Sequence, residues 1–147
     1  MKVSQQEIQP GDDKMPGESE VRKIIEEKHA LIAEAFRRED ASIIASQVFS
    51  EDGWCIGAEE NNHHGRAAIE KVFSSFVTAY DWTSSPNVIK VADAMAWDLA
   101  QASIRSKTGD DSHHFKLLFV WQKVGESWRA GIQMYVDGKL GTQSERT

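Results

Sequence analysis

The feature that most constrains the fold is the order in which two hydrophobic periods follow each other along the chain. Between residues 19 and 80, apolar side chains recur at the spacing of helices, whereas from residue 95 to residue 136 they alternate with other side chains as in strands. Helices followed by a run of strands predict an α+β domain, because each amphipathic element must bury its apolar side against another layer.

The first helix is predicted to begin at Ser19, whose hydroxyl can cap the N-terminus, with Glu20 in the favourable first turn. Lys28 falls near the middle of the apolar face of this helix and His29 at its flank. We interpret Lys28 as an aliphatic stem that lies on apolar surface with its ammonium group in water. The predicted inward residues are Val21, Ile24, Ile25, Leu31, Ile32, Ala35 and Phe36.

Two further helices and one early strand are predicted before the run of alternating segments. A short second helix follows Asp40, which is a good N-cap residue, and a third spans residues 66–80. Residues 51–59 are predicted to form a strand between these helices. The segment DWTSSP, residues 81–86, has the composition of a turn.

A chain of 147 residues has the size of one domain with one hydrophobic core. Both ends are polar, and the N-terminal end is also interrupted by Pro and Gly. We therefore predict a disordered tail over residues 1–18, one domain over residues 19–138 and a polar C-terminal tail over residues 139–147.

The charge and composition exclude several classes of partner. A net charge of -6 with scattered Lys and Arg disfavours nucleic acid, because phosphate contacts need clustered basic residues. No apolar run approaches the ~20 residues of a membrane span, and the first 18 residues lack the apolar core of a secretory signal. Cys55 is the only cysteine, so no internal disulfide can form. We expect a cytoplasmic protein without a cofactor and without a nucleic-acid or membrane partner.

Three stretches of the sequence resemble a known superfamily: FRREDASIIASQVFSEDG, HGRAAI and FVWQKVGESWRAGIQMY. They are similar to a helix-and-acidic-pair segment, a helix opening and a hairpin of the nuclear transport factor 2-like superfamily. The resemblance covers residues 19–137 and is closest to the SnoaL-like and ketosteroid-isomerase-like group. It implies a cystatin-like cone in which about three N-terminal helices pack on a curved, mixed, mostly antiparallel sheet. It also implies a conical cavity and a homodimer formed through the outer face of the sheet.

Alternation along the strands indicates which side chains would line such a cavity. Phe115, Leu117, Phe119 and Trp121 form one apolar row, and His113 has the same parity, so we expect His113 at the cavity rim. In residues 95–105 the odd row is larger, so we expect it to face the cavity. The small even row, which includes Asp98, would then face a partner subunit. The predicted substrate-binding residues are Trp97, Gln101, Arg105, His113, Phe119, Trp121, Tyr135 and Phe73.

The acid and base groups of ketosteroid isomerases are missing at the positions that the resemblance implies. Ile32, Gly57 and Leu117 stand where the tyrosine, the base and the second acid would be. Gln133 stands where SnoaL-like cyclases have an acid, and it can donate a hydrogen bond but cannot take a proton. The remaining catalytic candidates are His63, His64, Asp52 and Gln133.

The histidine pairs HH at 63–64 and 113–114 raise the question of a metal site. Their spacing fits no ligand motif, and adjacent residues on a strand point to opposite faces, so we expect no metal. A metal-dependent hydrolase is therefore the least favoured of three functions, and two others remain open. The chain could bind a small organic substrate, such as a polyketide-like molecule or cyclic ketone, for a cyclase, isomerase or dehydratase step. Alternatively, it is a non-catalytic dimerisation or ligand-binding module.

Overall fold

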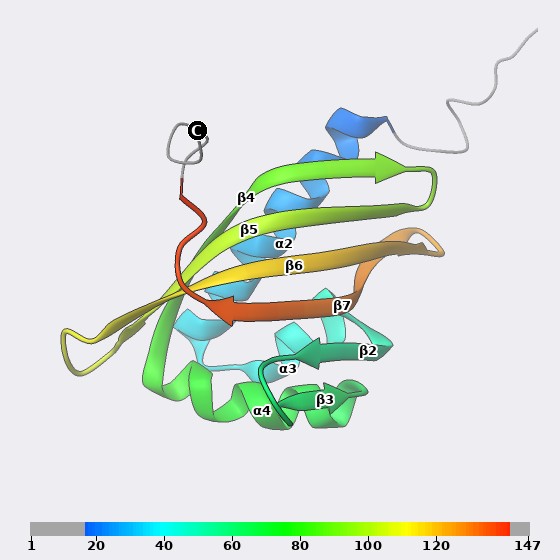
Figure 1. Cartoon of the computed structure of the whole chain (residues 1–147). Helices are drawn as coiled ribbons and strands as arrows, with labels where there is room; N and C mark the ends of the chain where they lie inside the picture. Colours follow the sequence, from blue (N-terminus) through cyan, green and yellow to red (C-terminus); the bar gives the residue numbers. More distant parts are fainter. Residues whose placement is uncertain (1–16, 142–147) are drawn as a thin grey trace, which may run out of the picture.

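The computed structural model describes residues 17–141, in which helices and one curved sheet form two layers (Figure 1). The parts of the predicted tails at residues 1–16 and 142–147 lie outside the described residues. In chain order the elements are α2 (Glu18–Arg38), α3 (Ala41–Ile43), the π-helical turn η1 (Ile44–Val48), β2 (Phe49–Ile56), β3 (Asn62–His64), α4 (Arg66–Ala79), β4 (Tyr80–Ala92), β5 (Met95–Ser106), β6 (Ser112–Val124) and β7 (Ser127–Asp137).

The sheet has six strands in the order β3-β2-β7-β6-β5-β4 within the described part of the chain. β2 and β7 run parallel, and the other neighbouring strands are antiparallel. The helices lie behind one face of this sheet, and the opposite face, which we call the outer face, is turned to the viewer in Figure 1. The predicted α+β class and the mixed, mostly antiparallel sheet are confirmed.

Helix α2 begins one residue earlier than predicted and without the predicted cap. Its N-cap is Gly17, which makes no side-chain hydrogen bond, so the capping role predicted for Ser19 was wrong. The buried face includes His29 together with the apolar residues Val21, Ile25, Ile32 and Phe36. His29 was expected at the flank of this face, and its burial shows that a polar partner must exist within the core.

The segment that follows α2 is held by two side-chain hydrogen bonds, one to Asp40 and one from Lys28. The Asp40 carboxylate accepts a hydrogen bond from the Ser42 backbone N–H at 3.1 Å, which confirms Asp40 as the N-cap of α3. The Lys28 ammonium donates to the Gln47 carbonyl at 2.7 Å, so it joins α2 to η1. Burial is the main cause that lowers the pKa of Lys28 to about 8, and Arg129 acts in the same direction.

The segment DWTSSP is part of a strand, so the turn predicted there was wrong. β4 runs without interruption from Tyr80 to Ala92 and forms the edge of the sheet. An edge strand tolerates Pro86, and the pairing with β5 shifts register between Pro86 and Val88. As a consequence, Trp82 and Ser84 alternate with exposed residues and face the helices.

The predicted direction of the β5 side chains was also wrong. Its even-numbered row, Ala96, Asp98, Ala100, Ala102 and Ile104, is buried beneath the helices. Small side chains leave room there for α2, and Asp98 is tolerated because buried donors pair with it. The odd-numbered row lies on the outer face, which carries Trp97 at 41% exposure together with Gln101 and Arg105.

After β7 the chain turns back over the outer face. The Gly138 backbone N–H donates to the His114 carbonyl at 2.9 Å, and the Leu140 N–H donates to the Gln101 side-chain oxygen at 2.7 Å. Figure 1 shows this segment passing in front of β6 and β5. Within residues 17–141, no helix combines the length and the apolar composition that crossing a bilayer requires.

Candidate functional site: a small aromatic cavity

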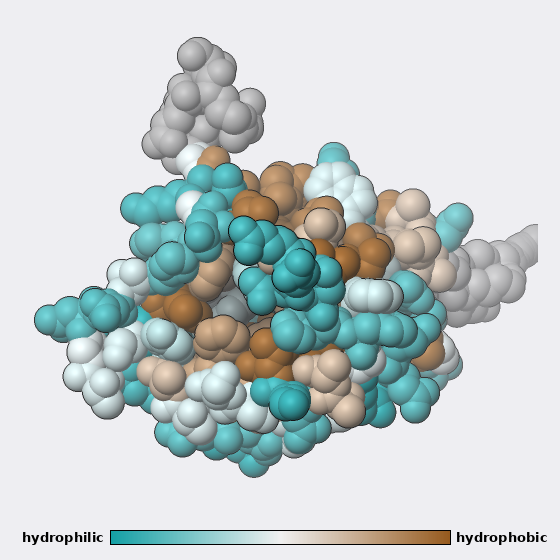
Figure 2. Space-filling model, turned by 60° about the horizontal axis from the view of Figure 1, so that its bottom comes forward, coloured by the Kyte–Doolittle hydropathy of each residue, from teal (hydrophilic) through white to brown (hydrophobic). Residues whose placement is uncertain are grey.

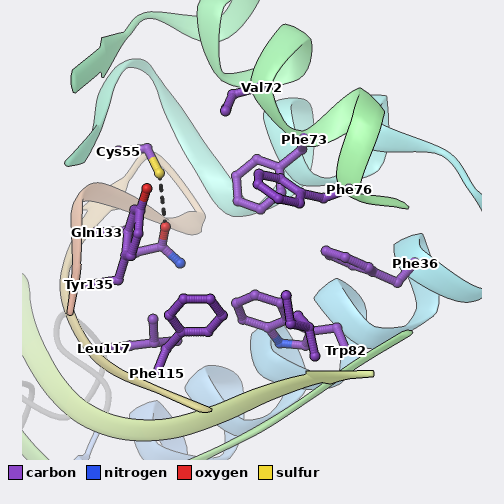
Figure 3. A pocket seen from close by; sticks show the side chains of 11 residues that line it. Phe36, Cys55, Val72, Phe73, Phe76, Trp82, Phe115, Leu117, Gln133 and Tyr135 are labelled. Atoms are coloured by element: carbon purple, nitrogen blue, oxygen red, sulfur yellow. Dashed lines mark hydrogen bonds between the residues drawn. The ribbon is translucent and has the colours of Figure 1, made fainter. Parts of the chain in front are cut away.

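A cavity of about 60 Å³ lies between α4, the C-terminal part of α2 and the inner face of the sheet (Figure 3). Apolar side chains surround the corresponding hollow on the molecular surface (Figure 2). The cavity is lined by Phe36 of α2, Val72, Phe73 and Phe76 of α4, Cys55 of β2, Trp82 of β4, Ile104 of β5, Phe115 and Leu117 of β6, and Gln133 and Tyr135 of β7.

Aromatic rings form most of the cavity wall and fix one another. Phe36 meets Phe73 edge-on with ring centres 6.3 Å apart, and it meets Trp82 at 5.3 Å. Phe115 meets Tyr135 edge-on at 5.7 Å on the opposite side. Edge-to-face contacts of this kind favour a rigid wall, because each ring has few alternative orientations.

Two polar side chains of the cavity, Cys55 and Gln133, are bonded to each other. The Cys55 thiol donates to the Gln133 oxygen Oε1 at 3.0 Å, and both side chains are buried. Burial raises the pKa of Cys55 to about 12, so the thiol keeps its proton at neutral pH and remains a donor.

The thiol thereby orients the Gln133 amide. With Oε1 held by Cys55, the amide nitrogen points into the cavity (Figure 3). This nitrogen carries two protons, and no side chain or backbone group of residues 17–141 accepts them. Gln133 is only 2% exposed, so a buried donor is left without a partner in the described part of the chain.

Tyr135 supplies a second hydrogen-bond donor at the cavity wall, its hydroxyl group. Burial is the main cause that raises the pKa of Tyr135, so the phenol is neutral at physiological pH. A Cβ atom at Gly57 would overlap the Tyr135 hydroxyl, so the ring can lie where it does only because residue 57 is glycine. Gly57 therefore has a steric role in the cavity wall.

The cavity holds no group that could exchange a proton near neutral pH. Its lining contains no Asp, Glu, His, Lys or Arg, and its two ionisable side chains, Cys55 and Tyr135, both stay protonated. What the arrangement can do chemically is donate hydrogen bonds to an oxygen atom and exclude water from it.

The predicted catalytic candidates other than Gln133 lie outside the cavity lining. His63 pairs with Cys55 across β3 and β2, whereas the ring of His64 stacks on Trp54 at 4.1 Å. Asp52 is exposed and accepts from the Ser50 hydroxyl at 3.2 Å. The structure therefore does not bring His63, His64 and Asp52 together with Gln133 as one site.

The predicted substrate-binding residues divide into three groups. Tyr135 and Phe73 line the cavity, and Phe119 and Trp121 face inward but lie deeper in the core. His113 is exposed and hydrogen-bonds Asp137 at 3.0 Å; it does not line the cavity itself but borders a neighbouring hollow that shares Ile104 with it. The third group lies on the outer face and consists of Trp97, Gln101 and Arg105.

Sequence reasoning missed two important members of the lining. Trp82 was assigned to a turn, although alternation with Ser84 and Pro86 would have placed it on an inward row. Cys55 was not assigned to the cavity, although it lies in the predicted early strand. No three His, Cys, Asp or Glu side chains of residues 17–141 come together as a metal ion would require.

Comparison with solved structures identifies the fold. A protein from Novosphingobium aromaticivorans, described as nuclear transport factor 2-like with a cystatin-like fold, superposes with a TM-score of 0.72 at 18% identity, over 87% of this chain and 88% of that one. The chain has the nuclear transport factor 2-like fold. The resemblance stated for the sequence is thus confirmed at the level of the fold.

Other proteins of the nuclear transport factor 2-like fold are similarly close. A domain of unknown function from Nostoc punctiforme matches with a TM-score of 0.70 at 17% identity, over 88% and 83% of the two chains. A ketosteroid isomerase-like protein from Erwinia carotovora atroseptica matches with a TM-score of 0.66 at 16% identity, over 84% and 98%. No protein-family model and no curated protein matches the sequence.

Proposed function

We propose that the protein binds a small, neutral, mostly apolar molecule that carries one acceptor oxygen, such as a cyclic ketone. The observation that supports this most directly is the buried Gln133 amide nitrogen, which faces an aromatic cavity and has no hydrogen-bond partner among residues 17–141. A buried donor left unpaired costs roughly 1–3 kcal/mol, and a ligand carbonyl would recover that cost. The fold of the neighbours, one of them described as ketosteroid isomerase-like, is compatible with such a ligand.

The cavity volume argues for a compact ligand. A volume of about 60 Å³ gives room for roughly four to six water-sized spheres, at ~10–15 Å³ for each sphere. A five-membered cyclic ketone has a comparable number of heavy atoms. A polycyclic substrate would require the side chains at the mouth, such as Phe76 at 39% exposure, to move outward.

The lack of charge in the cavity favours binding over acid–base turnover. Charged ligands would lose their hydration without gaining an ion pair, so a neutral ligand is favoured. A cyclase, isomerase or dehydratase step would need a proton acceptor, which the lining of this cavity does not supply. We therefore propose ligand binding and positioning as the function.

The test compares two probes of equal shape, cyclopentanone and methylenecyclopentane, by NMR titration of the isotope-labelled protein. The ketone should bind about tenfold more tightly than the alkene, because one hydrogen bond contributes ~1.4 kcal/mol. The Gln133→Leu variant should lose this preference while it retains the alkene affinity.

The matched control is Gln122→Leu, which changes the same residue type at an exposed position. It should leave both affinities unchanged. Equal affinity of the two probes for the native protein, or no binding of either, would reject the proposed function.

A second candidate function is self-association through the outer face. Cross-strand pairing aligns two apolar rows over β5, β6, β7 and β2. We call these eight side chains the outer patch: Trp97, Val120, Ile132 and Trp54 in one row, and Leu99, Leu118, Met134 and Ile56 in the other. Contiguous exposed apolar surface of this kind is typical of protein interfaces.

We propose a homodimer in which the outer patch packs on a second copy of itself. The small row Ala96, Ala100 and Ala102, which we expected at such an interface, is buried under the helices instead. In sedimentation velocity, Met134→Arg should shift the protein to a monomer, whereas Val136→Arg, on the same face outside the outer patch, should not. A native protein that sediments as a monomer would reject this candidate.

A further inference from the structure

A chain of hydrogen-bonded side chains runs through the core beside the cavity. Its members are Trp82 and Ser84 of β4, His29 of α2, Asp98 of β5 and Trp121 of β6. His29 is 2% exposed, and Asp98 and Trp121 are fully buried. Four different elements thus contribute to one polar group of contacts in an otherwise apolar region.

The chemistry of the two indoles fixes two of the donors in this chain. An indole N–H can only donate, so Trp82 donates to the Ser84 hydroxyl oxygen at 2.9 Å and Trp121 donates to Asp98 Oδ2 at 2.6 Å. The single Ser84 proton is then free to point at His29 Nδ1, which lies 2.6 Å away. With Nδ1 as an acceptor, the ring proton is on Nε2 and faces Asp98 Oδ1 at 3.2 Å.

Trp82 connects this polar chain to the cavity. Of the chain's members it alone lines the cavity, where its ring also contacts Phe36 at 5.3 Å. Its indole nitrogen points away from the cavity, towards the sheet (Figure 3). The Ser84 oxygen therefore holds the side of the indole that a ligand does not touch, and Asp98 anchors His29 behind Ser84.

We propose that Ser84 and His29 are positioning residues that fix the orientation of Trp82 and thereby set the shape of the cavity. Without an acceptor at Ser84, a nearly buried indole N–H would be unpaired, and the ring would turn to find another partner. A different ring orientation would move a large part of the aromatic wall. The effect on a ligand rests on the proposed function, whereas the effect on Trp82 itself does not.

The experiment compares Ser84→Ala, Ser84→Thr and Ser85→Ala in the full-length protein. Two quantities are measured for each: the indole N–H resonance of Trp82, assigned with Trp82→Phe, and the affinity for cyclopentanone. Ser84→Ala should shift the Trp82 resonance and lower the affinity for cyclopentanone about fivefold. Ser84→Thr keeps the hydroxyl in a strand and should restore both values, and Ser85→Ala, at the exposed neighbouring position, should change neither.

A purely structural role of Ser84 predicts a lower unfolding midpoint with an unchanged Trp82 resonance, and that result would overturn the proposal. If the native protein binds no cyclopentanone, the proposed function fails while the resonance still decides the positioning role. Ser84, His29 and Asp98 also have the order of a Ser-His-Asp triad. A fluorophosphonate adduct on Ser84 would show a nucleophile there and overturn the proposal; we expect none, because the Trp82 N–H engages the Ser84 oxygen.

Discussion

The cavity and the polar chain lie on the same face of the sheet and beneath the same helix, yet their chemistry is opposite. The cavity is hollow and aromatic, and the Gln133 amide nitrogen in its wall is a buried donor without a partner within residues 17–141. The polar chain is filled, and His29, Asp98 and Ser84 all have partners within it. The contrast teaches that, among the described residues, this core pairs its polar groups where packing is complete and leaves one amide nitrogen unpaired beside an empty space.

The largest expected effect concerns the cavity, and it shows whether the cavity excludes water. In the native protein, Cys55 should react with iodoacetamide at pH 8 on the order of 10³ more slowly than in the unfolded chain, since its pKa rises from 9.0 to about 12 and only the thiolate reacts. Mass spectrometry of quenched samples gives both rates. A Ser85→Cys, Cys55→Ser variant is the control and should react rapidly when folded. Rapid labelling of native Cys55 would mean that water fills the cavity, and the comparison would fail.

The second prediction concerns the filled region. Asp98→Ala removes the acceptor of both His29 and Trp121 and should lower the free energy of unfolding by about 3 kcal/mol, measured by urea denaturation. Asp110→Ala, which removes an exposed carboxylate, should change it by less than about 0.5 kcal/mol. If both variants lower the free energy of unfolding by equally little, then the hydrogen bonds of Asp98 do not stabilise the polar chain.

The third prediction sharpens the contrast, because the same kind of change has the opposite sign in the cavity. Gln133→Leu should raise the free energy of unfolding of the ligand-free protein by about 1 kcal/mol, since it removes an unpaired buried donor at nearly constant volume. Urea denaturation of this variant beside Gln122→Leu, which should be neutral, measures the effect. A clear loss of stability would show that the Gln133 amide nitrogen has a hydrogen-bond partner in the ligand-free protein.

The smallest expected effect concerns Lys28, at the border of the filled region. Its pKa in the folded protein is about 8, below its ordinary value of 10.5, so the unfolded chain binds the proton more tightly. The stability of the native protein relative to Lys28→Met should therefore rise between about pH 8 and pH 10.5. The gain should stay below about 1 kcal/mol, because water screens the half-exposed ammonium. A difference that is constant over this range would contradict the lowered pKa.

The fold could be predicted because it depends on long periodic segments. Alternation in β6 and the helical face of α2 both extend over enough residues for the pattern to exceed local exceptions. The inward row of β6 and the inward position of Phe73 were predicted on the same basis, whereas the position of Tyr135 was implied by the family resemblance.

The rest depended on contacts between distant residues, which a single sequence does not contain. Asp98 was assigned to the outer face because it belongs to the row of mostly small side chains in this strand, whereas the row of larger side chains was expected to face the cavity. Its two donors, His29 and Trp121, come from segments that lie 69 and 23 residues away. The error reversed every β5 side chain, because a strand can turn only one of its two rows inward. Pro86 likewise suggested a turn, although an edge strand has room for it.

The chain segment after β7 covers one end of the outer face and leaves the other end open. The backbone at Leu140, held by Gln101, lies over the cross-strand row Gln101–Lys116–Val136, next to the row that contains Met134. A second sheet that packs on the outer face would clash with this segment at many relative positions of the two sheets. The segment therefore limits how two such apolar faces can be aligned. In the proposed homodimer, residues 138–140 would thereby reduce the number of permitted alignments of the two subunits.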